Sequence, residues 1–148
     1  MKFSDLLSES DKEFRRKLLL NLESLENDAR LLPVQVYDIG YLTAKASVEY
    51  NEAAKDLKRT EDHLYISIKK AFDSMKVKAS EKTVETKIKT HSTYIKALEH
   101  HNNKKSEFEF IKAKKEALEV KLKMIQLAHE IVNNKMYLKR QITKQEDK

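Results

Sequence analysis

The chain has 148 residues, with one glycine, one proline, no cysteine and 36% charged residues. Sheet proteins need frequent turns, which Gly, Pro, Asn and Asp mostly supply, so this composition excludes all-β folds and Gly-rich phosphate-binding loops. The net charge is +6, but residues 1–75 carry −2 and residues 76–148 carry +8. This asymmetry predicts that an anionic partner would bind the C-terminal half.

The first predicted helix spans residues 10–31. The segment from Ser10 to Glu13 has the pattern of a capping box, in which a serine and a glutamate each bind a free backbone amide. Apolar residues follow at steps of three and four, which places them on one helix face. Pro33 is expected to end this helix, because the residue before a proline disfavours the helical conformation.

Two longer helices and one short helix are expected after the proline. Heptad spacing of apolar residues predicts a helix over residues 38–75. Ser80 is expected to cap a short helix over residues 80–90, and the longest helix is predicted over residues 92–142. The polar residues 143–148 are expected to form a flexible tail.

These elements predict an all-α fold, a single helical domain over residues 1–148. The two long helices are expected to form an antiparallel hairpin, with the N-terminal helix packed at one side. The apolar seam of the last helix is longer than one short helix can cover, so we expect a second copy to cover the rest and form a homo-oligomer. The predicted oligomer interface consists of Leu118, Leu122, Ile125, Val132 and Met136.

The polar residues form no recognisable catalytic or metal-binding motif. His129 begins a pattern typical of zinc proteases, but Asn133 stands where the second histidine ligand is required. His100 and His101 are adjacent, so on a helix they point about 100° apart. The carboxylates lie three or four residues from lysines, as solvated helix ion pairs do. We therefore expect no enzyme activity, no metal and no cofactor.

The N-terminus has no signal peptide pattern, and no apolar run is long enough to cross a membrane. We therefore expect a cytoplasmic protein with no membrane partner.

Lysines gather at the end of the second predicted helix and in the segment that follows it. Lysine is a flexible point charge that binds phosphates without reading bases, and a nearby aromatic ring can stack on an unpaired base. The pattern predicts sequence-independent binding of single-stranded nucleic acid, against the alternative of a merely solvated helix face. The predicted binding residues are Lys69, Lys70, Phe72, Lys76, Lys78, Lys87 and Lys89.

The segment 68–75, Ile-Lys-Lys-Ala-Phe-Asp-Ser-Met, resembles the L-K-A-R-L-D-Y-Y motif of the UvsY-type recombination mediators of T-even and related phages. Lys69 and Asp73 fall on the lysine and aspartate of that motif. Ala71 stands at its arginine position, and the tyrosine pair is replaced. The resemblance covers roughly residues 34–136 and is carried mostly by the order of helices and charges.

The resemblance implies an all-helical, ring-forming oligomer that binds single-stranded DNA. Such a protein helps to load a phage recombinase onto DNA coated by a single-strand-binding protein, and it has no enzymatic activity of its own. For a phage-encoded protein, the compartment would be the cytoplasm of the infected bacterium.

Two other classes of function stay open. In a coiled-coil scaffold or assembly protein, the apolar seam would be the functional part and the lysines would only keep the chain soluble. In a protein-binding adaptor, the helical hairpin would be the platform for a partner. Both alternatives predict little affinity for DNA.

Overall fold

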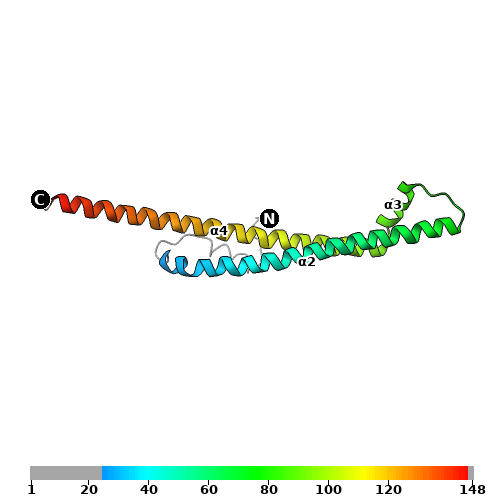
Figure 1. Cartoon of the computed structure of the whole chain (residues 1–148), viewed down its shortest axis with the longest axis horizontal. Coiled ribbons are helices and arrows are strands. Elements are labelled where there is room, and N and C mark those ends of the chain that lie inside the picture. Colours follow the sequence, from blue (N-terminus) through cyan, green and yellow to red (C-terminus); the bar gives the residue numbers. More distant parts are fainter. Residues whose placement is uncertain (1–24, 147–148) are drawn as a thin grey trace, which may run out of the picture. The chain divides into compact units, whose positions relative to one another are not determined.

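The computed structural model describes residues 25–146, which form three α-helices joined by short connections (Figure 1). Helix α2 spans Leu25–Ser74, α3 spans Glu81–Lys89 and α4 spans Ser92–Glu146. No strand occurs among the described residues, and the predicted all-α fold is confirmed. None of the described helices is long and apolar enough to span a membrane.

The expected helix end at Pro33 is wrong, because α2 continues through the proline. A proline inside a helix removes one backbone hydrogen bond and typically costs about 3 kcal/mol. Apolar packing continues across this position: Leu32 is buried, and Val36 packs against the same cluster. This continuous packing offsets the lost bond. Residues 25–31 therefore belong to α2, and residues 10–24 of the predicted first helix lie outside the described residues.

Helix α3 lies within the predicted range of residues 80–90, and the first and last residues of that range are its caps. Ser80 is the N-cap residue, and its side chain accepts a hydrogen bond from the backbone N–H of Thr83 at 3.2 Å. Thr90 is the C-cap residue. Val84 and Ile88, four residues apart on one face, are buried. A short helix of this kind depends on its caps and on one buried face, since nine residues are too few to be stable alone.

Helix α4 ends later than expected. Residues 143–146 are helical, where a flexible tail was predicted, and residues 147–148 lie outside the described part. The reason is visible in the sequence, because no glycine or proline occurs after Gly40. Nothing in residues 92–146 stops a helix once it has begun.

The chain divides into two compact units. The first unit comprises Met1–Gly40 and Ala113–Lys148, and the second comprises Tyr41–Lys112. When two helices pack side by side, each side chain contacts only residues of the other helix at the same position along the helix axis. Separate stretches of the same two helices can therefore build separate cores.

In the first unit, the buried cluster takes up three of the five predicted interface residues. Leu118 and Ile125 are 5% and 1% exposed, and Leu122 packs against them together with residues of α2. Leu118 and Ile125 are buried inside one chain, where a second copy cannot contact them, and the partly buried Leu122 packs against them, so these three are corrected to core residues. Val132 and Met136 are 48% and 54% exposed and remain accessible.

In the second unit, polar and aromatic contacts join the two long helices. The ring of Tyr50 on α2 stacks on Phe108 with centroids 5.9 Å apart and also contacts His101 at 5.2 Å. Beside them, the ammonium group of Lys104 donates to the carboxylate of Glu49 at 2.7 Å. These contacts fix the register of α4 on α2 within this unit.

Candidate nucleic-acid interface

The end of α2 is a sharp turn that directs the chain into the basic connecting segment. The backbone N–H of Val77 donates to the carbonyl of Phe72 at 3.1 Å, and the N–H of Lys76 donates to the carbonyl of Asp73 at 3.0 Å. This pair of bonds defines a Schellman motif. Lys76 has φ 56°, in the left-handed region that glycine usually occupies at this position.

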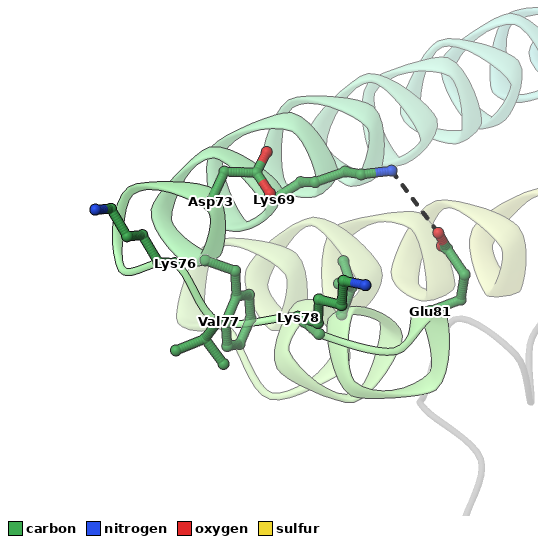
Figure 2. Close-up of a pocket in the computed structure, with 9 residues that line it drawn as sticks. Lys69, Asp73, Lys76, Val77, Lys78 and Glu81 are labelled. Carbon is green, nitrogen blue, oxygen red and sulfur yellow. Dashed lines mark ion pairs between the residues drawn. The ribbon is translucent and has the colours of Figure 1, made fainter.

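An open cleft of about 420 Å³ lies where this turn, the end of α2 and the start of α3 meet (Figure 2). The side chain of Lys69 reaches across the cleft towards Glu81, whereas Lys76 extends away from it (Figure 2). The cleft is lined by Lys69, Phe72, Asp73, Lys76, Val77, Lys78, Ala79, Glu81 and Val84. The structure thus brings together five of the seven predicted binding residues: Lys69, Phe72, Lys76 and Lys78 at the cleft, and Lys87 over Phe72.

Lys69 is held in a small network that links α2 to α3. Its ammonium group lies 3.8 Å from the carboxylate of Glu81 and donates to the hydroxyl of Tyr65 at 3.2 Å. The same hydroxyl donates to Glu81 at 3.1 Å. The bond to Tyr65, followed by the charges of Tyr65 and Glu81, raises the pKa of Lys69. Lys69 therefore links the end of α2 to the start of α3.

Phe72 is half-buried beneath α3. The ammonium group of Lys87 lies 5.9 Å from the centroid of the Phe72 ring, within the range of a cation–π contact. The structure therefore places Phe72 and Lys87 in the contact between α2 and α3, where the lysine covers one face of the ring.

The remaining predicted lysines are exposed, and in the described part of the chain their side chains form no hydrogen bond or ion pair. They are Lys70, Lys76, Lys78 and Lys89. Lys82 has the same properties but was not among the predicted residues. Its position could have been found from the sequence, because Lys82 and Lys89 lie seven residues apart and so share one face of α3.

Positive residues outnumber negative residues on this surface, but both kinds are present. Residues 69–89 contain seven lysines and three carboxylates. Two of the carboxylates, Asp73 and Glu81, line the cleft itself. The cationic groups without partners therefore lie near the end of α2, in the connecting segment and on the exposed face of α3. Such an arrangement can bind a phosphate chain by charge alone.

Other chemistry-bearing residues lie apart from one another. Within residues 25–146, no three His, Asp or Glu side chains are grouped so that they could hold a metal ion. The Nδ1 atom of His101 is buried without a hydrogen-bond partner, next to the ring of Tyr50.

Comparisons of the chain with protein-family models, with characterised proteins and with solved structures found no match. The resemblance to UvsY-type mediators rests on residues 68–75 and on the order of the helices, and it remains a prediction.

Proposed function

We propose that the protein binds single-stranded DNA without sequence preference through the lysines around the α2–α3 cleft. The observation that carries this proposal is the run of exposed, unpaired lysines from the end of α2 into α3: Lys70, Lys76, Lys78, Lys82 and Lys89. Lysines bind phosphates at many angles, so they suit a flexible single strand better than base-specific recognition of a rigid duplex. Arginine, which reads bases in bidentate contacts, is absent from residues 69–89.

In this proposal the protein acts as a recombination mediator of the UvsY type. It would help a recombinase to load onto DNA that a single-strand-binding protein covers, and it would do so without catalysis of its own. The support is the resemblance of residues 68–75, whose lysine and aspartate positions lie at the cleft as Lys69 and Asp73. A mediator needs contacts with DNA and with proteins, which is consistent with basic and apolar surfaces on one chain.

We further propose that α2 and α4 form an antiparallel hairpin and that the chain is a homo-oligomer. The hairpin is supported by contacts that run in opposite directions along the two helices. Asp28 pairs with Lys121 in the first unit, and Glu49 pairs with Lys104 in the second. The oligomer is supported by apolar residues of α4 that remain about half exposed in the single chain, such as Val132 and Met136.

The DNA-binding proposal is tested by titrating a fluorescent single strand of mixed sequence with the protein at two salt concentrations. The variant Lys70→Ala/Lys76→Ala/Lys78→Ala removes three unpaired charges and leaves the Lys69 network intact. The matched control, Lys45→Ala/Lys55→Ala/Lys58→Ala, removes three exposed lysines from the middle of α2. We expect weaker binding by the first variant only. Its slope of log affinity against log salt should flatten by about 2, at about 0.7 per lost phosphate contact.

Equal affinity of both variants would contradict the assignment of this surface. Failure of the unchanged protein to bind any single strand would contradict the mediator function as a whole. The alternative, a coiled-coil scaffold, would then be favoured by the exposed apolar residues on α2 and α4, including Tyr41, Val48 and Leu127. A scaffold of this kind would self-associate without DNA.

A further inference from the structure

Helix α4 carries a second apolar stripe, which the packing of the single chain leaves open. It consists of Val120, Met124, Leu127, Ile131 and Leu138, each between 48% and 61% exposed. The first four residues follow one another at steps of four, three and four. After a further step of three to Asn134, a step of four reaches Leu138. The whole stripe lies within the first unit.

This stripe lies on the face of α4 opposite the buried cluster. Val120 comes two residues after the buried Leu118, and Leu127 comes two residues after the buried Ile125. At 3.6 residues per turn, two residues correspond to about 200° around the helix axis. The helix that covers Leu118 and Ile125 therefore cannot also cover the stripe.

The spacing of the stripe identifies the kind of surface that it fits. Alternating steps of four and three repeat every 3.5 residues, which is the period of a helix that packs along another helix. A row of half-exposed aliphatic side chains over 19 residues, from 120 to 138, is also unusual for a surface that stays in water. The surface is therefore suited to a second amphipathic helix.

The charges beside the stripe favour a second copy of the same helix. One flank carries Glu116, Lys123 and Glu130, and the other carries Lys114 and Lys135. In a parallel pair in register, a residue on the first flank faces the residue five positions later in the partner. Glu130 would then face Lys135, twice by symmetry. An antiparallel pair about the middle of the stripe, at residue 129, would bring Glu130 near Glu130 of the second copy instead.

We propose that two copies of the chain pair through this stripe, α4 beside α4, parallel and in register. Asn134, the one polar residue in the row, then lies opposite the same residue of the second copy. The proposal gives a surface and an orientation to the homo-oligomer proposed above, on which it rests, and it does not depend on DNA binding. It also replaces Leu118 and Ile125, which are buried in the chain's own core, and Leu122, which packs against them.

Cysteine cross-linking of the full chain tests the orientation, because the natural sequence contains no cysteine. In a parallel pair Leu127 lies next to Leu127 of the second copy, so Leu127→Cys should form a covalent dimer when treated with diamide. The control Gln126→Cys is exposed but lies outside the stripe, and it should give little dimer. Equal yields from the two variants, or no dimer from Leu127→Cys, would overturn the parallel register.

Sedimentation of the same full chain tests the surface. The variant Met124→Lys/Ile131→Lys should halve the mass of the assembly or reduce it to a monomer, with helicity unchanged, since both residues are about half exposed. The control Gln126→Lys/Asn133→Lys adds the same charge beside the stripe and should keep the parent mass. If the first variant keeps the mass of the parent oligomer, the proposed stripe is wrong but oligomerisation stands. If the parent is a monomer, both proposals are wrong.

Discussion

Lys121 and Asp28 form an ion pair inside the apolar cluster of the first unit, with 3.1 Å between the ammonium nitrogen and Oδ2 of the carboxylate. The two side chains are unequally buried, at 6% and 25% exposure. Lys121 lies on α4 between Leu118 and Ile125, two members of the buried cluster. A pair in such a place ties one register of α4 to α2, because any shift would separate the buried ammonium group from this carboxylate.

Replacing Asp28 and replacing Lys121 should lower the free energy of unfolding by different amounts. Asp28→Ala leaves the deeply buried Lys121 without this carboxylate, and we expect it to lower the free energy of unfolding by about 2–3 kcal/mol. Lys121→Met keeps the length of the side chain among apolar neighbours and leaves a carboxylate that water can reach, so its cost should be below about 1 kcal/mol. Urea unfolding followed by circular dichroism measures both values, and a larger loss for Lys121→Met would contradict this account.

Gly40 is an internal residue of α2 whose replacement can raise the stability of the protein. A Cβ atom built at this position meets no atom within 4 Å. Because glycine in a helix interior is about 1 kcal/mol less favourable than alanine, Gly40→Ala should raise the free energy of unfolding by about that amount. The reverse change at an exposed position of the same helix, Ala44→Gly, should lower it by a similar amount. Thermal unfolding of both variants checks the prediction, and a loss of stability in Gly40→Ala would contradict it.

The helices were predictable from the sequence where nearby residues determine where a helix begins or ends. Ser80 and its spacing to Thr83 indicate the start of α3, and the absence of breakers indicates a continuous α4. Pro33 shows where the local rule fails. The local preference of proline against a helix is weaker than the apolar packing of the residues before and after it. That packing involves residues of α4 more than eighty positions later, such as Leu118. No local pattern reports a contact at that separation.

The candidate site was predictable in its composition but not in its contacts. The sequence alone shows many lysines between residues 69 and 89, and most of them are exposed in the structure. It does not show that Lys69 is bound to Tyr65 and Glu81, because that network exists only once α3 folds back onto α2. The sequence contains both apolar stripes of α4, but it does not show which of the two α2 covers and which stays exposed.

The pair formed by Glu49 and Lys104 should make stability depend on pH. The hydrogen bond from Lys104, together with its charge, lowers the pKa of Glu49 below its ordinary value of 4.5. A carboxyl group whose pKa is lower in the folded state contributes stability above its unfolded value, and this contribution is lost as the pH falls through the folded pKa. The melting temperature should therefore fall more steeply below about pH 4.5 in the parent than in Glu49→Gln. Glu52→Gln, which changes an exposed carboxylate one turn away, should keep the parent profile.

Lys76 combines an unfavourable backbone conformation with an unpaired charge, so its replacement should separate stability from binding. Its φ of 56° costs a residue with a Cβ atom about 1 kcal/mol relative to glycine. Lys76→Gly should therefore raise the free energy of unfolding by about 1 kcal/mol, since the hydrogen bonds of the turn are made by the backbone and remain.

The same change should weaken binding to single-stranded DNA and flatten the salt slope by about 0.7, the contribution of one phosphate contact. Lys78→Ala removes a neighbouring charge without changing a left-handed residue, so it should weaken binding alone and leave stability unchanged. Paired measurements of thermal unfolding and of DNA affinity at two salt concentrations test both variants. If Lys76→Gly gains stability and keeps full affinity, Lys76 is only a turn residue and lies outside the path of the strand.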